Sequence, residues 1–566
     1  MKTQLEQNLN NNYYNPKNLK QNGNNPSFKG ITAAVNGVSK FLADEPVWGA
    51  TGVDIGSMVI PRTWTDVKKR GAVAGFETGF REAESSANDA LIGVYGVAAG
   101  SLIAGALNNK YNVTAHKIFA SDDAVSVYSA KWEKHNGNVS EFAKDIVDNL
   151  EAYNPNSKHA NAEGFVKIPE EHKQGIIDDL KYVAEGDRNG MPDRWKEVKK
   201  RLSAKLLEAT GTEQEFRLVH NDGAAKKVTV ANSKTMFENF YRLSEALKSD
   251  KVKGKVGEFV KSYKGFGKTR TAIGIAIAGV FAVIAQPLNV YISKKRTGTD
   301  GFVGVEGRKK DNSKSFKLLK LASGVGMMTI ALASMGALAK NPLKIPKLFI
   351  EKNQYKGKSP TINQFKTVFG LAITSRLLAA RDKDEHREVV TKDVLGFFNW
   401  LILGKVVNQL ILHKFQAKGA NLLKRAPLPQ NPTRLQKIGN FLSSSIATHS
   451  EVVVDGLRKE RPDIKSIIKP NGQAMKFNEM LKLLPKGGQA RKNLRLLNIA
   501  QWSGYVYSAL VLGKGIPNLN IYLTNLSEKH KRAKMAMVHQ NSQAAGDKIA
   551  INKQVENTAF SQIKTH

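Results

Sequence analysis

The sequence predicts a mainly α-helical, membrane-associated protein with Gly-rich apolar helices, a soluble α-rich insertion that carries one β-hairpin, and disordered termini. The first observation is a set of apolar windows of 23, 20 and 19 residues that contain no charged residue. The second is amphipathic helical spacing between Lys110 and Tyr263. The third is a formal net charge of +36, which favours contact with a polyanion such as an anionic membrane surface.

Composition divides the 566-residue chain into several segments, because this length exceeds one ordinary hydrophobic core. The first 27 residues contain nine Asn and no apolar stretch typical of a signal peptide, so we expect a disordered head. The predicted segments are the Asn-rich head 1–27, an N-terminal helical segment 28–109, a soluble insertion 110–263, a basic region of apolar helices 264–526, and a polar basic tail 527–566.

The apolar windows are candidate membrane spans. Residues 271–293, 321–339 and 90–109 each reach the length of about 20 residues that crosses a hydrocarbon core of about 30 Å. Two weaker candidates are 394–412, which Lys405 interrupts, and 496–513. A central lysine costs about 3 kcal/mol on insertion, so Lys405 must reach the interface or face protein.

Glycine within these windows favours helix-to-helix packing in lipid. Glycine weakens an exposed helix in water by up to about 1 kcal/mol relative to alanine. In lipid, small residues let helices approach closely, and Gly96 with Gly100 forms a G-x-x-x-G pattern. Pro287 marks a place where the 271–293 window could turn or kink. The alternative is a soluble bundle whose apolar helices are buried on all sides.

Basic residues flank the windows and predict contact with anionic lipid. We interpret them as interfacial anchors: Lys268, Arg270, Lys294, Lys295 and Arg296. Residues 294–320 hold nine basic residues against three acids, and 340–392 hold twelve against five. Since strictly alternating spans cannot place every basic loop on one side, we expect one basic face and some paired, re-entrant insertions.

The insertion 110–263 reads as a water-soluble unit and as the best place for a protein partner. Amphipathic helices are predicted at 140–153, 170–185, 193–210 and 235–249. Residues 216–220 and 226–231 alternate around an Asn-Asp-Gly turn, which predicts a hairpin.

Two local patterns invite a ligand-binding interpretation. Gly267-Lys268-Thr269 could end a nucleotide-binding loop, but Ser262 stands where that loop requires glycine. Residues 185–195 resemble the calcium loops of thrombospondin type 3 repeats and of related bacterial repeats, with Glu185, Asp187, Asn189 and Asp193 as oxygen donors. The favoured interpretation of this second pattern is a Gly-Pro turn in which Asp193 caps a helix.

The charged residues before the first window carry two interpretations. Glu77, Arg81, Glu84 and Asn88 share one helical face, which could hold an embedded active site. The favoured interpretation is an ion-pair ladder on a solvated helix surface.

No motif predicts a catalytic residue, a metal site or a cofactor. The chain has no Cys, no H-E-x-x-H and no G-x-S-x-G. We therefore expect a structural or interaction protein anchored in a bacterial-type inner or cytoplasmic membrane. The alternatives are a nucleic-acid-binding basic helical protein, for which no focused basic domain is present, and a membrane channel, transporter or embedded enzyme that uses Glu77, Arg81 and Lys405.

Overall fold

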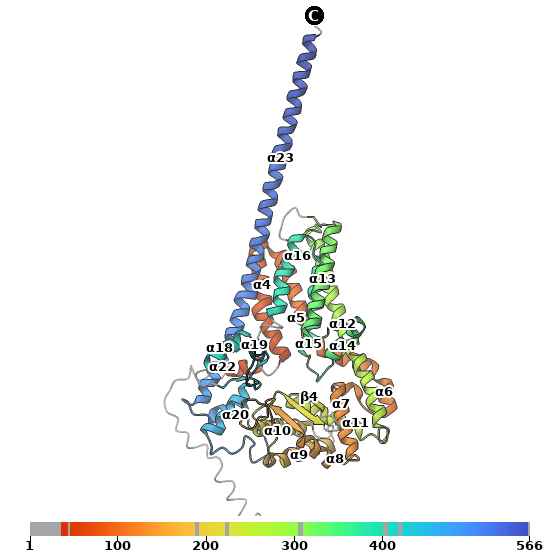
Figure 1. The fold of residues 1–566 in the computed structure, drawn as a ribbon, viewed down its shortest axis with the longest axis vertical. Coiled ribbons are helices and arrows are strands. Elements are labelled where there is room, and N and C mark those ends of the chain that lie inside the picture. The colour runs from red at the N-terminus through yellow and green to blue at the C-terminus, as the bar shows by residue number, and fades with distance from the viewer. Residues whose placement is uncertain are drawn as a thin grey trace, which may run out of the picture.

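The computed structural model describes residues 35–42, 46–186, 192–220, 226–303, 309–399, 406–416 and 421–563. The Asn-rich N-terminal segment 1–27 and Lys405 lie outside these ranges. The fold is mainly α, as predicted. Figure 1 shows a sheet-containing unit at one end, an upright helical bundle above it, and one long helix that projects past the bundle.

The sheet-containing unit, which we call the head, is formed by residues 115–247. Its helices are α7 (Asp122–Lys134), α8 (Val139–Asp148), α9 (Glu170–Glu185), α10 (Pro192–Thr210) and α11 (Ser233–Leu247), preceded by the short turn η3 (Ala115–Lys117). They surround an antiparallel sheet of order β2-β1-β3-β4, built from β1 (Leu150–Tyr153), β2 (Phe165–Lys167), β3 (Phe216–His220) and β4 (Lys226–Ala231). The predicted hairpin is β3 with β4, and its turn lies outside the described residues.

One helix of the head is shorter than predicted. The helix expected over 140–153 ends at Asp148, and Leu150–Tyr153 is a central strand. Leu150 and Ala152 are fully buried, and they pair with Leu218 and Phe216 of β3. The local sequence continues the helical pattern, but the pairing partners lie more than sixty residues away, and burial in the sheet overrides local propensity.

A buried carboxylate stabilises the head. Asp145 accepts hydrogen bonds from Lys131 Nζ at 2.5 Å and His135 Nε2 at 2.8 Å. Burial alone would raise the pKa of Asp145, but these hydrogen bonds outweigh it and lower that pKa to about 2. Because the folded pKa lies below the unfolded one, the stabilisation is present at neutral pH and is lost as pH falls from about 4 towards 2.

Asp145→Asn is therefore expected to destabilise the protein at pH 7 by about 1 to 3 kcal/mol, the usual worth of a buried hydrogen-bonded charge. Thermal unfolding of the detergent-solubilised protein at pH 7 and pH 3 measures it, and the difference from wild type should shrink at pH 3. Asp148→Asn is the control, because Asp148 is 35% exposed and its ion-pair partner among the described residues is Lys173, at 2.8 Å. Equal losses for both variants would contradict the assignment.

The bundle contains α3 (Pro46–Asp54), η2 (Ile55–Val59), α4 (Ile60–Arg70), α5 (Ala72–Ile103), α6 (Gly105–Tyr111), α12 (Val256–Thr297), α13 (Lys314–Ser334), η4 (Pro342–Lys344), α14 (Ile345–Lys352), α15 (Ile362–Ala379), α16 (Lys383–Val389), η5 (Val390–Val394) and α17 (Leu395–Phe397). Helices α5 and α12 are antiparallel: Asn289 Nδ2 donates to the Glu77 carbonyl, and Asn88 Nδ2 donates to the Ala278 carbonyl. Helix α13 is likewise antiparallel to α15, since Lys320 Nζ reaches the Ala380 carbonyl at the opposite end from Lys366 and Ser334.

Helix α12 continues without a break through Pro287, where the sequence indicated a turn or kink. Proline has no N–H, so it leaves the carbonyl of Val283 without its helical donor. Ser375 Oγ of α15 donates to that carbonyl at 2.8 Å. A neighbouring helix thus satisfies the freed group, as in transmembrane helices that tolerate proline.

A C-terminal module packs beside the head. It comprises α18 (Val406–Gln416), β5 (Leu423–Lys424), α19 (Arg434–Ser443), β6 (Ser445–Ile446), α20 (His449–Glu460), α21 (Phe477–Leu483) and α22 (Gln489–Tyr507). Its core includes Leu207 of the head, and Ser466 Oγ donates to Glu208 of α10 at 3.0 Å. Much of the region predicted as membrane helices, 264–526, therefore lies against the head.

Helix α22 leads through η7 (Ser508–Gly515) into α23 (Ile516–Ile563), the long projecting helix of Figure 1. At 1.5 Å per residue its 48 residues span about 72 Å. Lys531 Nζ contacts Asp384 of α16 at 2.7 Å, so the first turns of α23 pack on the bundle. The predicted polar tail 527–566 continues this helix as far as Ile563.

Among the described residues, α12 and α13 are long and apolar enough to cross a membrane, and α5 with α6 forms a further candidate bent by 60°. These correspond to the windows 271–293, 321–339 and 90–109. The weaker windows 394–412 and 496–513 do not meet this criterion within the described part of the chain.

Candidate functional site

Large apolar side chains are exposed around the bundle, and we call them the apolar belt. They lie on α5, α12, α13, η7 and α23: Val94, Leu102, Val280, Phe281, Ile284, Leu288, Leu321, Val325, Leu510, Leu519 and Tyr522. Soluble monomers rarely leave so many large apolar side chains exposed on neighbouring helices. The belt fits a lipid environment or a protein partner.

Basic side chains border the apolar belt at both ends of the bundle. Lys294, Lys295 and Arg296 are exposed at the end of α12, and the Arg296 guanidinium lies 3.9 Å from the centre of the Phe76 ring. Lys340 and Lys344 are exposed beyond the opposite end of α13. This differs from the single basic face that we expected. The reason is that α13 runs once along the bundle, so the loops before and after it lie at opposite ends.

The two other predicted anchors occupy different environments. Lys268 is 45% exposed and lies 3.6 Å from Asp122 of the head. Arg270 is only 1% exposed: its Nη1 donates to the Ile118 carbonyl at 2.6 Å, and its guanidinium lies over the Phe119 ring. The anchor prediction for Arg270 is therefore wrong, because this side chain joins α12 to the segment that leads into the head. Residues 265–270 are helical, so no nucleotide-binding loop forms.

Buried ion pairs run through the bundle interior beside α5, and we call them the ionic seam. Near the start of α5, Arg381 Nη2 lies 2.6 Å from Glu77 Oε1 and 2.9 Å from Glu385 Oε1, and Arg381 is 1% exposed. Further along α5, Glu82 pairs with Arg62 at 2.9 Å and with Lys392 at 3.0 Å. Arg376 of α15 pairs with Asp393 at 3.1 Å.

The ionic seam replaces the predicted solvated ladder of α5. Glu77 is 4% exposed and pairs with Arg381, three hundred residues later, instead of with Arg81. The ladder prediction is therefore wrong. The sequence shows the helical face of α5 correctly, but α15, α16 and η5 cover that face, and local spacing contains no information about them.

The seam lies at the depth of the apolar helices. Residues 77–89 of α5, which contribute to the seam, lie beside the part of α12 between Asn289 and Ala278. This part of α12 belongs to the apolar window 271–293.

π-Helical turns border the seam. Lys392 and Asp393 project from η5, and Arg62, one turn after η2, donates from Nε to the Leu512 carbonyl of η7 at 3.1 Å. Such turns are found frequently at functional sites. Here they bring charged groups from segments 450 residues apart into one interior.

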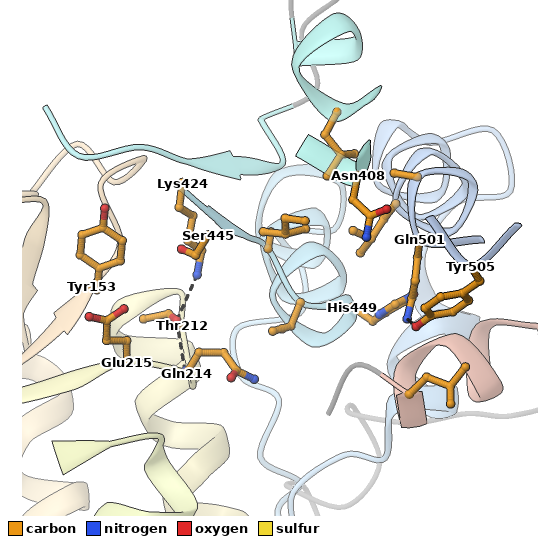
Figure 2. Close-up of a pocket in the computed structure, with 17 residues that line it drawn as sticks. Tyr153, Thr212, Gln214, Glu215, Asn408, Lys424, Ser445, His449, Gln501 and Tyr505 are labelled. Atoms are coloured by element: carbon orange, nitrogen blue, oxygen red, sulfur yellow. Dashed lines mark hydrogen bonds between the residues drawn. The ribbon is translucent and has the colours of Figure 1, made fainter. Parts of the chain in front are cut away.

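A separate cavity of about 480 Å³ lies between the head and the C-terminal module. Figure 2 shows Tyr153, Glu215 and Lys424 on one side, and Asn408, Gln501 and Tyr505 on the other. Lys424 Nζ contacts Glu451 at 2.7 Å and donates to Thr212, while burial raises the pKa of Glu215. The size suits a small molecule or a peptide side chain, with polar groups at both ends.

The weak calcium loop is only partly described. Glu185 ends α9 and Asp193 lies in the first turn of α10, whereas Asp187 and Asn189 fall outside the described residues. Within the described ranges, no cluster of three His, Asp or Glu side chains could hold a metal ion. The calcium prediction therefore stays untested.

The chain matches no protein-family model, no curated protein and no solved structure. Its function must therefore be inferred from its own geometry.

Sequence reasoning did not single out Arg376, Arg381, Lys392 or Asp393. A signal was present for Arg376, which is the one charged residue of the stretch 367–379 in α15.

Proposed function

We propose that this protein is a structural or interaction protein that spans a bacterial-type inner membrane through its helical bundle. The observation that carries the proposal is the apolar belt bordered by basic side chains at both ends. The apolar window of α12 is 23 residues long, about 35 Å at 1.5 Å per residue, which matches a hydrocarbon core of about 30 Å. The basic borders suit anionic headgroups.

This placement gives each end of the molecule a separate role. The head and the C-terminal module lie at one end of the bundle, and α23 extends from the other (Figure 1). A partner on one side of the membrane would meet the head, where insertion 110–263 and the 480 Å³ cavity offer recognition surfaces. A partner on the other side would meet α23.

Extraction and protease access test this proposal. We expect the protein to stay in the membrane fraction after carbonate or high salt, because buried apolar helices hold it. In sealed vesicles of one orientation, protease should cleave either the head loops or α23, and both only after detergent. Release by salt alone, or cleavage at both ends in sealed vesicles, would contradict the spanning arrangement.

The ionic seam favours a second candidate, a channel, transporter or membrane-embedded enzyme. Ionisable groups at membrane depth usually mark a functional pathway. Ion flux in vesicles that contain the purified protein distinguishes this candidate from a purely structural role. Salt-sensitive binding to DNA or RNA by the extracted protein would instead support the nucleic-acid alternative.

A further inference from the structure

A small cavity lies at the lower end of the ionic seam. It measures about 10 Å³ and is lined by residues of α3, η2, α4, α5, α15, η5 and α17, including Asp54, Arg62, Asp89, Lys392 and Asp393. This is about the space of one water molecule. The cavity therefore has room for a single small, polar occupant.

Asp89 lines this cavity and forms no ion pair with any residue that the structure describes. The residue is 5% exposed, and its Oδ1 accepts no hydrogen bond from any residue that the structure describes. The adjacent Asn88 bonds to Ala278 in the middle of the α12 window, which sets the depth of Asp89. An ionised carboxylate that is buried without a partner is strongly unfavourable.

The neighbouring cations are already engaged. Arg62 and Lys392 both pair with Glu82, and Arg376 pairs with Asp393. Asp54 of α3 accepts a hydrogen bond from Ser86. The described charged groups around Asp89 are Asp54 from α3, Arg62 from α4, Arg81, Glu82 and Glu84 from α5, Arg376 from α15, and Lys392 and Asp393 from η5.

Without Asp89, the four acids of this set, Asp54, Glu82, Glu84 and Asp393, are balanced by four cations, Arg62, Arg81, Arg376 and Lys392. With Asp89 included, five acids face four cations among the described residues, so Asp89 adds the surplus negative charge. Protons are the smallest species that can remove this surplus, and the cavity gives them a water-sized exchange position beside Asp89.

We propose that Asp89 is a proton-binding site of the bundle, protonated in the folded protein and exchanging its proton through the small cavity. The O–H bond forms on one Asp89 carboxyl oxygen, and the proton comes from and returns to water. The inference goes beyond membrane anchoring, because it depends only on the bundle interior. Failure of the extraction test would therefore leave it standing.

The test is Asp89→Asn in the full-length, detergent-solubilised protein, with unfolding measured from pH 5 to pH 8. If folded Asp89 holds a proton that the unfolded chain releases, wild-type stability falls with rising pH, by up to about tenfold in the folding equilibrium constant per pH unit. Asp89→Asn should remove the part of this slope that Asp89 contributes. Infrared spectra should show a protonated carboxyl band in wild type that the variant lacks.

Glu388→Gln is the control, because Glu388 is a seam carboxylate with a partner, Arg70, at 2.5 Å. It should leave both the slope and the infrared band in place. An unchanged slope and band in Asp89→Asn would overturn the proposal. If that variant does not fold, the wild-type band decides: its absence across the pH range overturns the proposal. Sodium-dependent stabilisation of wild type that Asp89→Asn abolishes would show a metal-ion site instead.

Discussion

Arg381→Ala is expected to reduce the free energy of unfolding by about 3 to 5 kcal/mol, the usual effect of removing one partner from a buried ion pair. Arg381 is 1% exposed and bonds both Glu77 and Glu385. Its removal leaves two carboxylates buried together. Two buried carboxylates side by side repel each other when both are ionised, so the variant should hold protons on this pair.

The pH dependence of Arg381→Ala follows from that protonation. Without the guanidinium, we expect the folded variant to bind a proton that the unfolded chain releases, so the lost stability should be partly regained as pH falls from 8 to 5. Thermal unfolding in detergent measures both effects. Arg387→Ala is the control, since its side chain is 34% exposed and its pair with Asp384 should contribute at most about 1 kcal/mol. A similar loss for both variants would contradict a special role for the buried pair.

Gly96→Leu is expected to destabilise the bundle by about 3 kcal/mol or to prevent its assembly, because the site has no room for a side chain. A Cβ atom at Gly96 would lie 2.3 Å from Cζ of Tyr355. Tyr355 is 1% exposed and donates from its hydroxyl to the Ile92 carbonyl at 3.0 Å, so it cannot move aside easily. Across the same contact, a Cβ at Gly274 would lie 3.4 Å from Cα of Gly96.

Gly326→Leu is the matched control for this substitution. Gly326 also lies inside an apolar helix, but a Cβ there would meet no atom of the described residues within 4 Å. This variant should be neutral or slightly stabilising, since leucine has the higher helix propensity. The measurement is the melting temperature in detergent together with the yield of folded protein. Comparable losses at both positions would show that glycine acts through backbone flexibility and not through close packing.

Sequence patterns predicted the elements whose periodicity is strong and local. The helix predicted at 170–185 matches α9, and the hairpin partners 216–220 and 226–231 match β3 and β4. The G-x-x-x-G pattern correctly indicated close packing at Gly96. What it did not indicate was the contacting residue: Tyr355 fills the contact together with α12, from a segment that carries no such pattern.

The candidate site could be predicted only in part. Glu77 and Arg81 were singled out because they precede an apolar window, and Glu77 does lie in the ionic seam. Its partner Arg381 lies in a polar stretch that resembles a surface loop, and only the folding of α15 and α16 against α5 makes it interior. The interpretation of Arg270 failed for the same reason, since its acceptor is a carbonyl 152 residues away.

By itself, the sequence determined that this protein is mainly helical, that its longest apolar helices can cross a membrane, and that basic residues border them. These properties follow from composition and from spacing within single elements. The tertiary structure alone decided which charges are interior, which windows pack beside the head, and where an acid such as Asp89 has no ion-pair partner among the residues that the structure describes. The reason is that burial and ion pairing depend on neighbours from distant parts of the chain, and the strength of a charge interaction depends on how much water those neighbours exclude.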